Sequence, residues 1–219
     1  MRTIALCTQK GGSGKSTIAT SLAVCAAQAG EQVIAIDTDD QGTLAAWGLA
    51  RPAGAPTVAA MTRAHQLAEL LAEARTRFGV AVIDTPGRDS ALTHTVMAAA
   101  DLCLVPIRPT KADAHGNRPT VEACIRADRR FAFVLTQCAT TIYNPRAEQM
   151  AAGLTALGVL APTLIGLRVD YQDAYAAAQG VTEYAPESRA ADEIRTLWAW
   201  ISSTVTDPDR AQEITRNAA

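Results

Sequence analysis

Short apolar segments recur along the chain, and each is separated from the next by a stretch long enough to hold a helix. They lie at residues 3–7, 33–36, 80–83, 102–107, 131–135 and 163–165. Regular alternation of this kind predicts βαβ units and a mostly parallel sheet. The run at 80–83, Val-Ala-Val-Ile, is apolar at every position, as expected for a strand that helices cover on both sides. The pattern therefore predicts an α/β fold in which a mostly parallel, twisted sheet has helices on both faces.

The stretches between the apolar runs predict alanine-rich helices that pack closely on the sheet. Examples are residues 19–29, which Gly30 follows as a C-terminal cap, and residues 66–77. The Pro/Gly-rich segment 51–56 is interpreted as a surface loop, because the sheet pattern resumes after the following helix. A chain of 219 residues is long enough for one α/β domain with a buried core. We therefore expect a single domain over residues 1–206 and a polar tail over residues 207–219.

Composition and charge narrow the class of protein. Hydrophobic residues make up 48% of the chain, charged residues 19%, and the formal net charge is -2, as in an ordinary soluble protein. This balance provides no bulk basic field for nucleic acid, so any DNA contact has to come from a local patch of arginines. The N-terminus begins directly with a strand pattern, and no apolar run approaches the length of a membrane span. We expect a cytoplasmic protein.

The cysteines are interpreted as reduced thiols of the core. They show no C-x-x-C spacing, and most lie in apolar runs. Ligation of a metal ion or an iron-sulfur cluster by these residues is therefore not expected. The five positions are Cys7, Cys25, Cys103, Cys124 and Cys138.

A glycine- and lysine-rich turn between the first apolar run and the first helical pattern is the strongest chemical signal. Residues 10–17 read Lys-Gly-Gly-Ser-Gly-Lys-Ser-Thr. A strand, such a turn and a helix start form the arrangement in which backbone N–H groups surround the phosphates of a nucleotide. Lys15 neutralises phosphate charge, and the Ser16 hydroxyl is an oxygen ligand for Mg²⁺. The predicted nucleotide-binding residues of the turn are Gly11, Gly12, Ser13, Gly14, Lys15, Ser16 and Thr17.

Two features separate this turn from an ordinary glycine-rich loop with solvated lysines. The chain contains only three lysines, Lys10, Lys15 and Lys111, and two of them lie in this one turn. The common phosphate-loop pattern G-x-x-x-x-G-K-[ST] is not met, because Gln9 stands five positions before Gly14. Where the common pattern fails, the turn instead carries a second lysine, Lys10, next to Gln9.

Acidic residues directly follow two of the predicted strands, at the edge where a parallel sheet places its ligand. Asp84 ends the apolar run at 80–83 and precedes Thr-Pro-Gly. A carboxylate at this point can hold Mg²⁺ opposite Ser16, directly or through water. An aspartate that only caps the turn before Pro86 is the competing interpretation. The other acidic cluster, residues 37–42, reads Asp-Thr-Asp-Asp-Gln-Gly.

The turn at residues 10–17 matches K-G-G-x-G-K-[ST], the deviant Walker A motif of the ParA/MinD family of dimeric ATPases, which this chain closely resembles. Residues 37–42 resemble the family motif D-x-D-P-Q-G, with Asp40 in place of the proline. Residues 101–109, DLCLVPIRP, followed by Asp113, and residues 168–183, RVDYQDAYAAAQGVTE, are similar to two further stretches of the family. The resemblance covers nearly the whole chain and is nearest to the short, plasmid-type ParA proteins such as ParF.

The resemblance implies roles for individual residues. Lys10 crosses a dimer interface and reaches the phosphates bound by the other subunit, as an arginine finger would. Asp39 positions the attacking water, and Asp37 belongs to the magnesium shell. Gly87 is either the glycine that senses the γ-phosphate or an ordinary turn glycine. The residues expected to flank the adenine are Thr136, Gln137, Val169 and Asp170.

For function, the resemblance implies an ATPase that uses ATP and Mg²⁺, releases ADP, and forms a sandwich homodimer with ATP. The dimer is expected to bind nucleoid DNA without sequence preference, and a ParB-like or other partner to stimulate hydrolysis and release. Repetition of this cycle moves a plasmid or a chromosome locus through the nucleoid. The candidate DNA contacts are Arg126, Arg129, Arg130, Arg189 and Arg195.

Other functions share the same nucleotide fold. A related ATPase positions a protein cargo, such as a chemoreceptor cluster or a microcompartment. A MinD-like regulator of cell division needs a basic amphipathic tail, and residues 197–201 are the only candidate segment. Serines and aspartates follow that segment instead of lysines, which favours a helix packed on the core. An amidating ligase needs an additional domain, and a relative of nitrogenase reductase needs paired interface cysteines, neither of which the sequence indicates.

Overall fold

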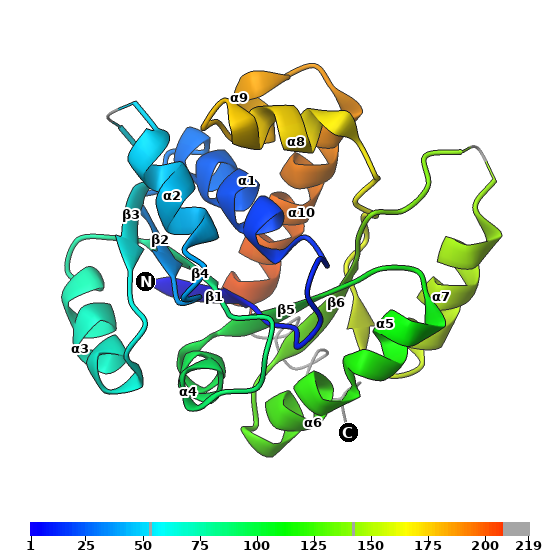
Figure 1. The fold of residues 1–219 in the computed structure, drawn as a ribbon, viewed down its shortest axis with the longest axis horizontal. Helices are drawn as coiled ribbons and strands as arrows, with labels where there is room; N and C mark the ends of the chain where they lie inside the picture. The colour runs from blue at the N-terminus through cyan, green and yellow to red at the C-terminus, as the bar shows by residue number, and fades with distance from the viewer. Residues whose placement is uncertain (53, 142, 208–219) are drawn as a thin grey trace.

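The computed structural model describes residues 1–52, 54–141 and 143–207, and Figure 1 shows how its elements are arranged. Seven strands form one sheet in the order β3-β2-β4-β1-β5-β6-β7, and every pairing is parallel. This sheet confirms the α/β fold class. The strands are β1 (Arg2–Leu6), β2 (Val33–Asp37), β3 (Thr57–Ala60), β4 (Val80–Asp84), β5 (Leu102–Ile107), β6 (Phe131–Leu135) and β7 (Val159–Leu160).

Helices cover both faces of the sheet (Figure 1). The helices that pack on one face are α1 (Lys15–Gln28), α2 (Thr43–Ala50), α8 (Val169–Ala176), α9 (Val181–Tyr184) and α10 (Arg189–Thr206). Those on the opposite side are α3 (Ala64–Ala74), α4 (Ala91–Ala99), α5 (Lys111–Gly116), α6 (Arg118–Arg126) and α7 (Pro145–Thr155).

Strand β4 shows why a central strand is apolar at successive positions. Val80 and Val82 belong to the core beneath α1 and α10, whereas Ala81 and Ile83 belong to the core on the other face. Successive side chains of a strand point to opposite faces, so a strand between two helical layers needs apolar residues on both faces up to the end that carries the site.

The two ends of the sheet differ from the sequence prediction. Strand β3 was not predicted; it lies at the sheet edge, none of its residues is fully buried, and its short apolar run at 58–60 follows the Pro/Gly-rich loop directly. The strand predicted at residues 163–165 is wrong, because β7 lies earlier in the chain. The Ile165 amide nevertheless donates to the Leu135 carbonyl, and Gly166 forms an isolated bridge with Cys138. The apolar run at 163–165 therefore makes isolated backbone contacts beside the end of β6 and does not form a strand.

The last helix packs on the core, as its sequence indicates. Leu197, Trp198 and Ile201 are buried in the same cluster as residues of α1. Among the described residues no helix is long and apolar enough to cross a membrane. Of the tail expected over residues 207–219, residues 208–219 lie outside the described part of the chain.

Two smaller expectations are also confirmed. Gly30 follows α1 with a φ of +90°, a left-handed conformation suited to the end of a helix. All five cysteines are buried and free of disulfides.

Candidate functional site

The carboxyl ends of three strands bring the predicted chemical residues together. Strand β4 lies between β1 and β2 in the sheet, and both Leu6 of β1 and Asp37 of β2 pair with Asp84. The loops that follow these strands open onto one cavity of about 480 Å³, here called the phosphate cavity. Its lining residues are Gly11, Gly12, Ser13, Gly14, Lys15, Ser16, Thr17, Asp39, Gln41, Thr43, Pro86, Gly87 and Arg88.

The glycine-rich turn passes into α1 through left-handed residues. Gly12 has a φ of +73°, and Gly14, the N-cap of α1, has a φ of +90°. A side chain at either position would strain the backbone. Gly14 offers no side chain to cap the helix, so the first N–H groups of α1 are left for another acceptor. The positive end of the helix dipole makes an anion the favoured acceptor.

Lys15 places a cation at the floor of the phosphate cavity. Its side chain is largely buried, and this burial lowers its pKa, while the charges of Asp84 and Asp39 act in the opposite direction. Gly87 lies directly above the turn: a Cβ built there would come within 3.5 Å of both Lys15 Nζ and Gly11 Cα. Glycine at this point therefore keeps the space around the lysine open.

Asp84 is buried without the partners that a buried carboxylate normally has. It is 1% exposed, and neither carboxylate oxygen has a hydrogen-bond partner among the described residues. Burial raises the pKa of Asp84 to about 7, against the opposing effects of the nearby Ser16 hydroxyl and the Lys15 charge. An orphaned carboxylate beside a hydroxyl is a donor set that suits a hard cation such as Mg²⁺.

Asp37 organises the loop after β2. Its Oδ1 accepts the Asp39 amide at 2.9 Å, and its Oδ2 accepts the Ala45 amide at 2.8 Å. Thr38 ties the same loop to β4, because both its amide and its hydroxyl donate to the Asp84 carbonyl. Each Asp37 oxygen is thus already engaged by the backbone. Asp39 accepts the Gln41 amide at 3.1 Å and lines the phosphate cavity.

Lys10 lies apart from the phosphate cavity of its own chain. Of the described residues, those lining the cavity begin at Gly11 and do not include Lys10. The side chain lies against the last residue of α5 instead, where a Cβ built at Gly116 would lie 3.5 Å from Lys10 Cδ. A hydrogen bond from the Thr8 hydroxyl to Asn117 fixes the adjoining backbone, and the Lys10 amide donates to Thr8 Oγ1 at 3.1 Å.

Residues after β5 and β6 brace the glycine-rich turn from the other side. The Thr136 hydroxyl donates to the Ser13 carbonyl at 2.9 Å, and Gln137 Nε2 donates to the Gly12 carbonyl at 2.6 Å. The Arg108 guanidinium pairs with Asp113 at 3.0 Å and also faces Gly12. Arg108 was not predicted, although it stands inside the quoted segment 101–109.

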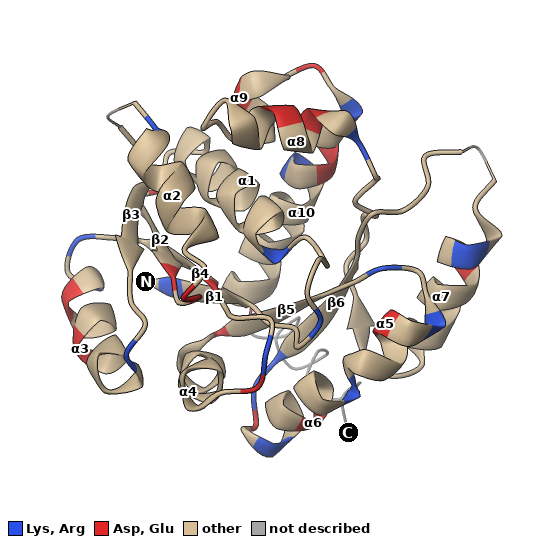
Figure 2. Cartoon of the chain, in the orientation of Figure 1, with Lys and Arg blue, Asp and Glu red and all other residues tan. Residues whose placement is uncertain are grey.

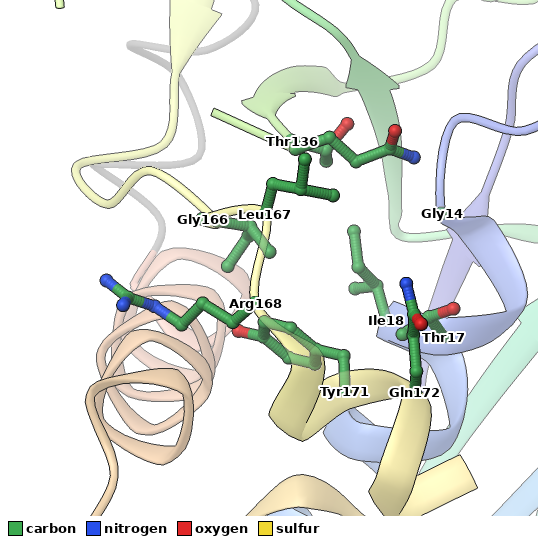
Figure 3. A pocket seen from close by; sticks show the side chains of 11 residues that line it. Gly14, Thr17, Ile18, Thr136, Gly166, Leu167, Arg168, Tyr171 and Gln172 are labelled. Carbon is green, nitrogen blue, oxygen red and sulfur yellow. The ribbon is translucent and has the colours of Figure 1, made fainter. Parts of the chain in front are cut away.

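A second cavity, of about 170 Å³, opens beside the first turn of α1 and shares Gly14 and Thr17 with the phosphate cavity (Figure 3). We call it the side cavity. Its lining residues are Gly14, Thr17, Ile18, Thr136, Gln137, Ile165, Gly166, Leu167, Arg168, Tyr171 and Gln172.

The residues expected beside the adenine are only partly found at the side cavity. Thr136 and Gln137 line it. Val169 and Asp170, in contrast, are not among the described residues that line it, and Val169 is 64% exposed at the start of α8. Leu167 and Tyr171 line the cavity on this side instead.

Asp40, which stands where the family motif has proline, pairs with Arg88. The two residues belong to the loops after β2 and β4, two neighbouring strands whose loops both contribute residues to the phosphate cavity. Both side chains are more than half exposed, so the pair contributes little to stability. Arg88 was not predicted; its place next to Gly87 was the available signal.

The candidate DNA arginines form two separate groups. Arg126 ends α6 and, with Arg129 and Arg130, precedes β6, so this group lies at the amino edge of the sheet, away from the phosphate cavity. Arg189 and Arg195 are exposed on α10, where Arg195 pairs with Asp192. Lys and Arg positions are spread over many elements in Figure 2.

Comparison with known proteins supports the motif assignment. Residues 4–100 match the family described as "CobQ/CobB/MinD/ParA nucleotide binding domain". Maintenance of carboxysome distribution protein A from Halothiobacillus neapolitanus is 29% identical over 205 residues, which are 89% of this chain and 94% of that protein. Chromosome partitioning protein ParA from Caulobacter vibrioides is 33% identical over 140 residues, 63% of this chain and 48% of that protein. The chain thus matches about half the length of that ParA.

Solved structures share the fold. The Aquifex aeolicus MinC:MinD cell division complex matches with a TM-score of 0.77 at 15% identity, covering 93% of this chain and 96% of that chain. An ATP complex of a Cyanothece McdA variant matches with a TM-score of 0.71 at 14% identity, covering 94% and 96%. Sequence and structural comparisons together confirm the resemblance to the ParA/MinD ATPases.

Proposed function

We propose that this chain, which resembles the ParA/MinD ATPases in motif and fold, is a Mg²⁺-dependent ATP hydrolase that forms a homodimer around ATP. Its proposed role is the partition of plasmid or chromosome DNA: the ATP-bound dimer binds nucleoid DNA non-specifically, and a ParB-like partner stimulates hydrolysis and release. The observation that carries the proposal is the convergence of Lys15, Ser16 and Asp39 on one cavity beside the orphaned Asp84.

Each group has one task in this proposal. Lys15 and the N–H groups of residues 11–17 bind the phosphates. Ser16 and Asp84 hold Mg²⁺, which neutralises phosphate charge when bound. Asp37 keeps the loop after β2 in shape through its two backbone hydrogen bonds and reaches the metal only indirectly. Asp39 accepts a hydrogen bond from the attacking water and orients it towards the γ-phosphate.

Lys10 acts in trans. Its side chain lies against the last residue of α5, outside its own phosphate cavity, so this lysine is available to a second subunit. Across a dimer interface its charge would stabilise the negative charge that develops on the transferred phosphoryl group. ATP then becomes part of the interface, and dimer formation and hydrolysis depend on the same residue.

Substitution of the three lysines tests the proposal. We expect Lys15→Ala to abolish ATP binding, measured by calorimetry. Lys10→Ala should retain ATP binding by the monomer and lose both the ATP-dependent dimer, measured by light scattering, and hydrolysis. The matched control is Lys111→Ala, which removes the exposed third lysine on α5. Unchanged turnover in Lys10→Ala would refute the action in trans.

A second candidate function is the positioning of a protein assembly. The observation that favours it is the match over 94% of the Halothiobacillus protein, whose name describes carboxysome distribution. Deletion of the gene separates the two roles. Rapid plasmid or chromosome loss supports DNA partition, whereas normal DNA inheritance with a mislocalised assembly supports positioning. In either case, DNA binding by the ATP-bound protein should weaken steeply as salt rises.

A further inference from the structure

Glu193 of α10 lies behind the wall of the side cavity and joins three of the residues that form this wall. Its Oε2 accepts the Gly166 amide at 3.0 Å and lies 3.0 Å from the Tyr171 hydroxyl. Its Oε1 accepts Arg168 Nε at 2.8 Å and also lies 2.8 Å from Arg168 Nη2. Glu193 is not among the described residues that line the cavity, so it acts through its neighbours.

These contacts are buried enough to fix the geometry of the wall. The side chain of Glu193 is 13% exposed and that of Arg168 is 20% exposed. Charge-assisted hydrogen bonds in such surroundings are roughly twice as strong as neutral ones. Figure 3 shows the Arg168 side chain directed towards α10 and away from Ile18, so its guanidinium pairs with Glu193 and does not extend into the cavity.

The backbone of the wall is shaped to receive this carboxylate. A Cβ built at Gly166 would lie 2.9 Å from Arg168 Nε and 3.2 Å from Glu193 Oε1. Glycine therefore lets both charged groups approach the backbone closely. The next residue, Leu167, is held on its other side by its amide, which donates to the Cys138 carbonyl at 2.8 Å.

The surface that this network fixes is apolar and suits a planar base. Ile18 and Leu167 face each other across the side cavity, with the Tyr171 ring beside them (Figure 3). Because the two cavities share Gly14 and Thr17, a nucleotide with its phosphates in the phosphate cavity can extend its base here. We infer that Glu193 is a positioning residue for the nucleotide base: it fixes the Gly166–Leu167–Arg168 wall against which the base binds.

This inference rests on the proposed ATPase function and makes a separate claim about binding. Glu193→Gln removes the charge that holds Arg168 and leaves the phosphate cavity unaltered. We expect KM for ATP to rise about 10-fold, the equivalent of one lost hydrogen bond to a charged group, with kcat within two-fold of the parent. Discrimination between ATP and UTP should fall by a similar factor, since the wall contacts only the base.

The test measures steady-state hydrolysis of ATP and UTP with Mg²⁺ on the full chain. Asp192→Asn is the matched control, because it makes the same charge change on the neighbouring, exposed position of α10. A network that serves only the fold would lower the fraction of active protein, and hence the apparent kcat, and leave KM unchanged. An unchanged KM, with or without a lower kcat, therefore overturns the inference. If the parent chain hydrolyses no ATP, the proposed function fails instead.

Tyr171→Phe keeps the test decisive if Glu193→Gln does not fold. This variant removes the hydroxyl, which lies 3.0 Å from Glu193 Oε2 and 3.1 Å from the Ala190 carbonyl, and leaves the ring in the cavity wall. We expect KM for ATP to rise about two- to five-fold with kcat unchanged, less than for Glu193→Gln, because Glu193 keeps its contacts with Arg168 and Gly166. A KM equal to that of the parent chain would overturn the inference.

Discussion

The orphaned carboxylate of Asp84 should lower the free energy of unfolding of the metal-free protein when it is ionised. Burial raises its pKa from the ordinary value of 3.8 to about 7. At 1.36 kcal/mol per pKa unit, this rise corresponds to about 4 kcal/mol of destabilisation once the group is ionised in both the folded and the unfolded chain. We therefore expect Asp84→Asn to stabilise the metal-free protein at neutral and alkaline pH while it abolishes Mg²⁺-dependent ATP hydrolysis.

The pH dependence identifies the cause. An acid whose pKa is raised on folding supports the fold fully below its unfolded pKa, and this support is lost as the pH rises through the folded pKa. The difference in unfolding free energy between Asp84→Asn and the parent should therefore grow between about pH 4 and pH 7 and then level off. A pH-independent offset of about 1–3 kcal/mol for the unpaired amide acts in the opposite direction and leaves the slope unchanged.

Urea unfolding in the presence of a chelator, followed by tryptophan fluorescence over this pH range, measures the difference. Asp113→Asn is the control: Asp113 is also buried, but its carboxylate pairs with Arg108 and accepts a hydrogen bond from the Thr110 hydroxyl, so its replacement should destabilise the protein. If the difference in unfolding free energy between Asp84→Asn and the parent stays constant over this pH range, the raised pKa of Asp84 is refuted.

The remaining predictions concern packing and the loops of the site. Gly180→Ala should destabilise the protein by about 1–3 kcal/mol, because its Cβ would lie 2.5 Å from Val24 Cβ in α1. Gly153→Ala in α7 meets nothing within 4 Å and should stabilise the protein by up to about 1 kcal/mol. Chemical denaturation measures both changes in unfolding free energy. Asp40→Asn removes the exposed pair with Arg88 and should change the unfolding free energy by less than about 1 kcal/mol. A larger loss in low salt would show that this pair holds the two loops together.

The parts of the molecule predicted from the sequence are those set by local pattern. The apolar runs predict the strands from β1 to β6 other than β3, because strands buried on both faces are apolar along most of their length. The glycine-rich turn is equally local, since each of its residue types has a steric or electrostatic reason. Strand β3 was missed because it has only four residues, none of them fully buried, so its apolar run at 58–60 is too short to stand out beside the Pro/Gly-rich loop.

The contacts that were not predicted are those made between distant segments. Arg88 meets Asp40 and Glu193 meets Gly166 only after the chain has folded, and no spacing in the sequence indicates either pair. Val169 and Asp170 were expected beside the base on the strength of the resemblance. A helix turns by 100° at each residue, so the start of α8 decides which of its neighbours face the cavity, and that start is a matter of tertiary structure.

The position of β1 at the centre of the sheet has a consequence for synthesis. Its two neighbours, β4 and β5, begin only at Val80 and Leu102, and the braces on the following turn come from Thr136 and Gln137. The turn that carries most of the chemistry is thus synthesised well before its neighbours, and its final contacts form only after Gln137 has emerged from the ribosome. Sheets built from such distant pairings fold slowly, so the nascent chain passes through a long interval in which its central strand is exposed.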